Sequence, residues 1–225
     1  MKKNSTTSFF EKIFNNRETA EKLASKATIR RYLTEDVIYI PGDPADEIYF
    51  IIKGIISLLR VTPNGRGIFL DFVEENRFFG DEILLDRTTG RMELAEVKKE
   101  VQLAAISASD FREMAFNDTV VARYLIEYTA NQTRNLTDRL EILLHREVRV
   151  RLAALLLDLA KTHGVRTKNG ILLNLNIPHH ELARFIGATR ETVSATISSF
   201  KASGAITSDG RRLVISDYDA LECLV

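Results

Sequence analysis

The chain of 225 residues has one cysteine, no tryptophan and a formal net charge of zero, with 31 basic and 31 acidic residues. A single cysteine, Cys223, excludes an intramolecular disulfide framework and a cluster ligated by several cysteines of one chain. No apolar run reaches the roughly 18–20 residues that span a bilayer, and the opening MKKNSTTSFFEKIF lacks the uninterrupted apolar segment of a signal peptide. We therefore expect a cytoplasmic protein. The balanced charge gives no bulk attraction to nucleic acid, so any DNA binding must depend on a local surface.

The first half of the chain has the patterning of β-strands. From about Tyr32 to Ser107, runs of β-branched and aromatic residues are separated by turn signals roughly every 8–12 residues. The dipeptide Asn64-Gly65 is a strong signal for a tight turn between two such runs. This pattern predicts an all-β barrel or sandwich, and the segment from Phe9 to Lys26 predicts a short helix before it.

The hydrophobic period changes after Asp110. From about Asn117 to Arg146 the chain has no glycine or proline, and residues recur at a helical spacing of three or four. Such a helix is roughly 40 Å long, too long for a small barrel to cover its apolar stripe, so we expect a coiled-coil homodimer. The polar middle of the stripe, ANQTRNLT, indicates a segment that sets register or contacts a ligand. The stripe comprises Leu125, Tyr128, Gln132, Leu136, Leu140 and Leu143.

The C-terminal segment IPHHELARFIGATRETVSATISSFKASGAI predicts two helices joined by a sharp turn. Gly187 can adopt a positive φ, Thr189 is a good N-cap residue and Gly204 is a stop signal. The next segment, AITSDGRRLVISD, predicts a strand, an Asp-Gly turn and a second strand. This order is typical of a winged helix-turn-helix. The residues expected to face inward are Leu182, Ala183, Ile186, Val193, Ile197 and Phe200.

The second of these helices carries many short hydroxyl side chains, which are mediocre helix formers. On an outward face they would let the helix enter a major groove and donate to phosphates and base edges. Arg190 suits the bidentate contact to guanine, and Glu191 can accept from cytosine N4. Arg211 and Arg212 in the wing would lie near the DNA backbone. The hydroxyls expected to face DNA belong to Thr189, Thr192, Ser194 and Ser198.

Three motifs, in this order, resemble the CRP/FNR family of bacterial transcription regulators over nearly the whole chain: PGDPADEIYFIIKG, FFGDEILL and RETVS. The junction LLHREVRVRLAALLLDLAKTHG, followed by NGILL, is similar to the global nitrogen regulators of cyanobacteria within that family. The resemblance implies an α+β fold with three parts. These are an N-terminal double-stranded β-roll of the cyclic-nucleotide-binding type with a short helix (1–116), a long dimerisation helix (117–146) and a C-terminal winged helix-turn-helix (147–225).

The resemblance also implies roles in DNA recognition. Arg190 and Glu191 fall where family members read a G·C pair. Many members have a second base-reading arginine where this chain has Ala195, so a bidentate contact worth roughly 1–3 kcal/mol is missing. His179 and His180 are candidate phosphate contacts.

For the sensor half, the resemblance implies a ligand site with substitutions. In members that bind cyclic AMP, a glutamate holds the ribose and an Arg-Ser pair holds the phosphate. Asp81 aligns with that glutamate, with Glu82 as the alternative after a register shift, and Arg91 aligns with the arginine. Met92 replaces the serine and removes a hydroxyl, which disfavours cyclic AMP.

The nitrogen regulators use an arginine and a glutamate of the long helix to bind 2-oxoglutarate. Here those positions are Gln132 and Thr137, with Leu136 beside Thr137, so the doubly charged acid loses its cationic partner. Cyclic AMP and 2-oxoglutarate are therefore both possible effectors that the substitutions at Met92, Gln132 and Thr137 disfavour. Two further interpretations stay open: a different effector held by Arg91, Asp81 or Glu82 and Thr137, or no effector at all.

All four histidines lie after residue 144, so the sensor half lacks the ligands of a haem site or of a His-based catalytic metal site. We expect Cys223 to pack and not to sense redox state. The combined expectation is a homodimeric transcription regulator, not an enzyme, that binds an interrupted palindrome in double-stranded DNA and activates by recruiting RNA polymerase. The alternative is a ligand-binding regulatory module whose helix-turn-helix contacts protein and not DNA. A β-roll enzyme is the third hypothesis.

Overall fold

The computed structural model describes residues 2–61, 67–84, 90–174 and 177–225. The chain divides into two compact units, Met1–Gln132 and Thr133–Val225. The division falls inside the long helix α4 (Thr119–Leu144), which is close to the predicted 117–146. The expected Asn64-Gly65 turn lies outside the described residues.

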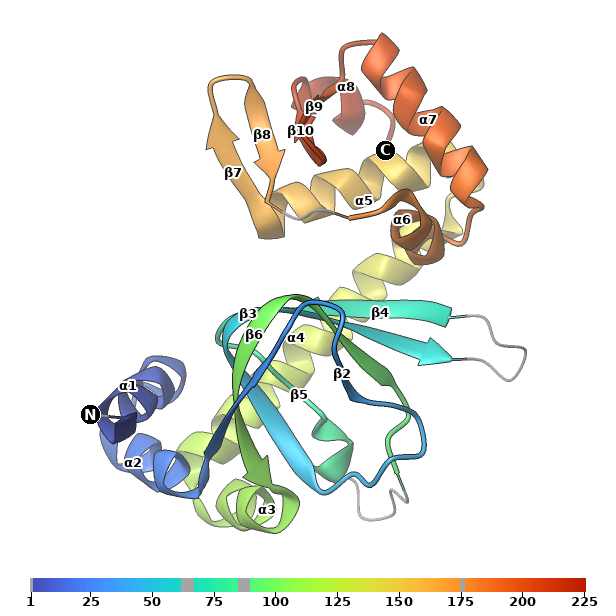
Figure 1. Ribbon diagram of the computed structural model, residues 1–225. Coiled ribbons are helices and arrows are strands. Elements are labelled where there is room, and N and C mark those ends of the chain that lie inside the picture. Colours follow the sequence, from blue (N-terminus) through green and yellow to red (C-terminus); the bar gives the residue numbers. More distant parts are fainter. Residues whose placement is uncertain (1, 62–66, 85–89, 175–176) are drawn as a thin grey trace. The chain divides into compact units, whose positions relative to one another are not determined.

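The first unit contains an antiparallel β-roll, as the family resemblance implied, built from the strands that the patterning predicted (Figure 1). Its sheet has the order β1-β6-β3-β4, with β2 paired to β6 and β5 paired to β3. The pairing of the long strand β3 with β6 shifts register around Gly54, where φ is +104° and an added Cβ would lie 2.3 Å from the Glu100 carbonyl oxygen. The strands are β1 (Thr28–Tyr32), β2 (Val37–Tyr39), β3 (Glu47–Val61), β4 (Gly67–Val73), β5 (Phe78–Phe79) and β6 (Leu94–Ser107).

The segment before the roll forms two helices, α1 (Lys2–Phe14) and α2 (Arg17–Lys26), so the prediction of a single short helix was wrong. The break has a local cause. Asn15 adopts a left-handed φ of +49°, and the side chain of Asn16 caps α2 by accepting from the Thr19 amide at 3.0 Å. Asparagine tolerates both roles.

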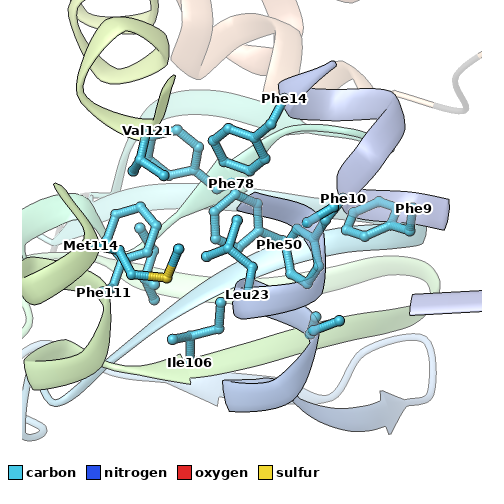
Figure 2. Close-up of a cluster of buried hydrophobic side chains, with 14 of the residues drawn as sticks. Phe9, Phe10, Phe14, Leu23, Phe50, Phe78, Ile106, Phe111, Met114 and Val121 are labelled. Atoms are coloured by element: carbon cyan, nitrogen blue, oxygen red, sulfur yellow. The ribbon is translucent and has the colours of Figure 1, made fainter. Parts of the chain in front are cut away.

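A cluster of aromatic side chains joins these helices to the roll and to α4 (Figure 2). The Phe10 and Phe50 ring centroids are 5.3 Å apart, and those of Phe14 and Tyr124 are 4.7 Å apart. Phe111, from α3 (Ala108–Asn117), completes the cluster 5.7 Å from Phe50. The N-terminal half of α4 is therefore fixed to the β-roll by packed rings.

The second unit begins with the end of α4 and continues with α5 (Val148–His163), whose apolar face is buried. Its four-stranded sheet has the order β7-β8-β10-β9. Cys223 at the C-cap of α8 is exposed, so the expectation that it packs was wrong. The remaining elements are β7 (Gly164–Thr167), β8 (Gly170–Leu173), α6 (His179–Ile186), α7 (Arg190–Ala202), β9 (Ile206–Asp209), β10 (Arg212–Ile215) and α8 (Tyr218–Glu222).

Candidate nucleic-acid interface and the Arg91 cluster

The turn between α6 and α7 has the geometry that its sequence predicted. Gly187 is left-handed, with φ +63° and ψ 45°, and ends α6. The Thr189 hydroxyl caps α7 by accepting from the Thr192 amide at 3.2 Å. Because only glycine adopts this conformation without steric cost, a sharp helix-turn-helix follows from these two residues.

The inward face of α7 is also as predicted. Val193, Ile197 and Phe200 are buried, against buried residues of α6 that include Leu182 and Ile186. The opposite face of α7 is exposed. The helix-turn-helix is thus fixed by an apolar seam, which leaves the outer face available to a partner.

Arg190 and Glu191 lie in the first turn of α7 and are exposed. Within the described residues, neither side chain forms a hydrogen bond or an ion pair. Two unengaged groups of opposite charge at the start of an exposed helix are suited to an external partner with both acceptor and donor groups, such as a base pair.

The hydroxyls of α7 are more engaged than the sequence suggested. Thr189 and Thr192 hydroxyl oxygens lie 2.9 Å apart, and the Ser198 hydroxyl donates to the Ser194 carbonyl at 3.0 Å. Ser194 is half-buried and its Oγ lies 2.8 Å from His179 Nδ1, so its hydroxyl connects α7 to α6. Ser194 is therefore less exposed than predicted, because His179 of α6 lies beside its hydroxyl.

The two histidines of α6 differ in environment. Partial burial, followed by the charges of Lys201 and Arg190, lowers the pKa of His179. His180 is exposed. These effects favour the neutral form of the His179 ring, while His180 presents its ring to solvent.

The wing consists of β9 and β10, joined through Gly210 at φ +60°. Arg212 Nη2 donates to Asp209 Oδ2 across the hairpin at 3.0 Å. Arg211 is exposed at the turn. Of the two wing arginines, Arg211 is the one available to a phosphate, since Arg212 is paired with a carboxylate.

In the β-roll, Arg91 lies at the centre of a group of interactions that we call the Arg91 cluster: Arg91, Glu82, Gly80, Tyr39 and the Glu47 carbonyl. Arg91 Nη1 donates to the Gly80 carbonyl at 3.3 Å and to Glu82 Oε2 at 3.2 Å, and Nη2 donates to the Glu47 carbonyl. The guanidinium lies 4.4 Å from the Tyr39 ring centroid. Its side chain is 0% exposed, and its Nε has no partner within the described residues.

The carboxylate that meets Arg91 is Glu82 and not Asp81. Both belong to the 3-10 helix η1 (Asp81–Leu84), but among the described hydrogen bonds of Arg91 the one to a carboxylate goes to Glu82. The register-shifted alternative is therefore the one the geometry supports. Met92 is 48% exposed and adds no polar group.

Glu93 is a member of this region that the sequence did not single out. Burial and, less strongly, the carboxylates of Glu82 and Asp81 raise the pKa of Glu93 from 4.5 to about 7. Arg60 Nη2 lies 3.3 Å from Glu93 Oε1. The side chains near Arg91 thus include three carboxyl groups, which is unfavourable for an anionic ligand.

The residues predicted on α4 divide between the two units. Gln132 Nε2 donates to the Tyr128 hydroxyl at 3.0 Å within the first unit. Leu136 and Thr137 belong to the second unit; the Thr137 hydroxyl donates to the Thr133 carbonyl at 3.0 Å, and Leu136 is 61% exposed.

The described residues contain neither a candidate metal site nor a candidate membrane-spanning helix. No group of three or more His, Cys, Asp or Glu side chains in the described ranges is placed to hold a metal ion. No helix in the described part of the chain combines the length and apolar character needed to cross a membrane.

Comparison with known protein families gives two matches. Residues 29–118 match the cyclic nucleotide-binding domain, and residues 150–224 match the Crp-like helix-turn-helix domain. The sequence is 27% identical over 194 residues to the global nitrogen regulator of Synechococcus elongatus, covering 86% of this chain and 87% of the relative. It is 28% identical over 199 residues to the cAMP-activated global transcriptional regulator Vfr of Pseudomonas aeruginosa, covering 87% and 92%.

Solved structures show the same architecture. A CRP-family transcriptional regulator from Thermus thermophilus aligns with a TM-score of 0.72 at 28% identity, over 87% of this chain and 95% of that one. The c-di-GMP responsive global regulator CLP of Xanthomonas campestris aligns with a TM-score of 0.77 at 22% identity, over 89% and 99%, and supports the fold alone.

Proposed function

Since the chain belongs to the CRP/FNR family of DNA-binding transcription regulators, we propose that it acts as a homodimer on an interrupted palindrome in double-stranded DNA. The observation that carries the proposal is the exposure of Arg190 and Glu191, without internal partners in the described residues, at the start of a well-capped α7. Two copies of α7 related by a two-fold axis would occupy successive major grooves about 34 Å apart.

In this proposal Arg190 donates to guanine O6 and N7, and Glu191 accepts from cytosine N4, so each half-site contains a G·C pair. Thr192, Ser198, His180 and Arg211 are exposed and suit phosphate contacts. Ser194 and His179 act indirectly by holding α6 and α7 together.

The dimer is supported by the apolar side chains that α4 leaves exposed. They are too numerous for a helix that faces only solvent, and a second copy of α4 would bury them. Their exposed fractions are Ile126 70%, Leu136 61%, Leu140 62%, Leu143 41% and Leu144 81%.

We propose further that DNA binding needs no cyclic nucleotide. Both terminal nitrogens of Arg91 already donate to groups of the protein, and Glu82 supplies the negative charge that a phosphate would otherwise bring. In the same proposal the protein acts in the cytoplasm as an activator that contacts RNA polymerase.

The test is selection of bound duplexes from a random library with purified protein and no added ligand, at two salt concentrations. We expect a two-fold-symmetric motif with a G·C pair in each half. Arg190→Ala should lose the preference at that base pair, at a cost of about 1–3 kcal/mol per half-site. Arg31→Ala, which removes an exposed arginine from β1, is the matched control and should leave the motif unchanged.

An absence of enrichment in every condition would contradict DNA binding and favour protein contact by the helix-turn-helix. Enrichment only after addition of cyclic AMP or 2-oxoglutarate would contradict the ligand-free part of the proposal. Transcription from a promoter that carries the selected site, measured with purified RNA polymerase, tests activation.

A further inference from the structure

Arg151 of α5 donates to three backbone carbonyls from two separate places in the chain. Its Nε donates to the Ile186 carbonyl at 2.9 Å, and its Nη1 donates to those of His145 at 2.8 Å and Arg146 at 3.1 Å. Ile186 is the last residue of α6, directly before the Gly187 turn. His145 and Arg146 directly follow the last residue of α4.

The Ile186 carbonyl needs such a partner because the last turn of a helix leaves carbonyl groups without intrahelical donors, and the His145 and Arg146 carbonyls lie just beyond the end of α4. A cation near a helix C-terminus is also favoured by the helix dipole. A guanidinium has five N–H groups in a planar fork, so it can serve both chain segments at once, whereas an ammonium group is a single point of donation. Arg151 therefore bonds the end of the long helix to the turn of the helix-turn-helix.

A second contact joins the same two elements. The Arg139 guanidinium of α4 lies 4.0 Å from the centroid of the Phe185 ring of α6. Phe185 immediately precedes Ile186, so neighbouring residues of α6 are held from α4 and from α5. Both Arg139 and Phe185 are half-buried, which strengthens a cation–π contact relative to a fully solvated one.

We propose that Arg151, together with the Arg139–Phe185 contact, positions the helix-turn-helix on the C-terminal part of α4 and thereby sets the half-site spacing that the dimer accepts. This inference depends on the proposed DNA-binding function. If α4 forms the dimer axis, the orientation of α6 on α4 determines where each α7 lies relative to its copy. A variant that lacks these contacts between α6 and the end of α4 would still bind a single half-site. It would lose its preference for one distance between the two half-sites.

The experiment measures affinity for the selected palindrome, for versions with one or two base pairs added to or removed from its centre, and for a single half-site. The variants are Arg151→Gln and Arg151→Lys, which remove the fork, and Phe185→Leu, which keeps an apolar side chain and removes the ring. Arg166→Gln is the control, because Arg166 is an exposed arginine of β7 in the same unit.

For Arg151→Gln and Arg151→Lys we expect the affinity for the palindrome of best spacing to decrease by at least about ten-fold, which is typical of losing charge-assisted hydrogen bonds. The affinity for a single half-site should stay within about three-fold of wild type. Discrimination between spacings should decrease for these variants and for Phe185→Leu. Thermal unfolding is followed in parallel, and Phe185→Leu provides the test if an Arg151 variant does not fold.

Folded variants that keep the wild-type ranking of spacings would overturn the inference. So would an equal loss of palindrome and half-site affinity, because that result would indicate damage to the helix-turn-helix itself. A wild-type protein that selects no palindrome would refute the proposed function, and this outcome is distinct from either result with the variants.

Discussion

Arg91, a predicted ligand contact, has its terminal nitrogens occupied by groups of the protein itself. Its terminal nitrogens are engaged by Glu82 and by two backbone carbonyls, and its side chain is fully buried. Removing one member of a buried ion pair typically costs about 3–5 kcal/mol because the other charge is left uncompensated. Arg91 is therefore a determinant of the β-roll's stability.

Gly80 is required by this arrangement. It has φ +83°, and a Cβ there would lie 2.6 Å from Arg91 Nη1. Gly80→Ala should lower the free energy of unfolding by more than about 1–3 kcal/mol, the usual cost of a left-handed non-glycine residue, because Arg91 must also move. Gly42→Ala is the matched control, with φ +94° and no atom within 4 Å of the added Cβ. Equal losses in urea denaturation would show that Arg91 does not restrict Gly80.

The raised pKa of Glu93 predicts that the stability of the folded protein depends on pH. Its pKa is raised from 4.5 to about 7 in the folded state, so between these values the folded state holds a proton that the unfolded state has released. Stability contributed by this group is therefore lost as the pH rises from about 4.5 to 7. Glu93→Gln should remove that decrease, and unfolding at pH 5 and pH 8 measures it.

The control for this prediction is Glu96→Gln on β6, which removes a carboxylate that lies 3.2 Å from Lys98. If Glu96→Gln produces the same change between pH 5 and pH 8, loss of an ion pair and not the raised pKa of Glu93 accounts for it.

At the scale of single elements, α7 illustrates what an N-cap contributes to the free energy of unfolding. Thr189→Ala removes the hydroxyl that accepts from the Thr192 amide, and should cost about 0.5–2 kcal/mol of unfolding free energy. Thr196→Ala is the matched change inside the helix, where the hydroxyl only donates to the Thr192 carbonyl at 2.8 Å. It should be neutral or slightly stabilising, because alanine is the better helix former. Thermal denaturation of both variants tests the cap, and a larger loss for Thr196→Ala would contradict it.

The elements that sequence predicted well are those determined locally. Gly187, Thr189 and the inward Val193 each follow from short-range rules about φ, capping and helical period, and the structure has all three features. The β-rich first half and the long helix followed from hydrophobic period, and the β-roll topology followed from the family resemblance. Arg151 could not be singled out in this way, since its partners lie up to 35 positions away in the chain.

The sites were harder to predict because the side chains that contact a site residue often come from other elements of the fold. The alignment placed Asp81 at the family's ligand-binding glutamate, with Glu82 as the alternative, and in the 3-10 helix η1 it is Glu82 that bonds to Arg91. Ser194 has the composition of a DNA contact, yet His179 approaches it from another helix. Residue type and spacing therefore gave the region in each case, and the structure adds the side-chain contacts within it.

At the scale of the whole molecule, the absence of net charge and the exposed stripe on α4 have a joint consequence. With a formal net charge of zero, long-range attraction to DNA is weak, and affinity must come from two half-sites bound together. Under the proposed function, dimerisation through α4 is then a condition for useful DNA binding, and a second copy would cover the exposed leucines of the helix.

Leu140→Asp tests this dependence directly. Leu140 is 62% exposed in the single chain, so the change costs little within one subunit. In the dimer it would bury a carboxylate in an apolar seam, which is strongly unfavourable. We expect a monomer in sedimentation velocity, a large loss of affinity for the palindrome and a nearly unchanged affinity for a half-site. The control is Asp138→Asn. Asp138 lies roughly 160–200° from Leu136 and Leu140 around the helix, so this change should leave the dimer intact. A Leu140→Asp protein that still sediments as a dimer would place the interface on a different surface, and the proposed two-fold arrangement of α7 would then have to be abandoned.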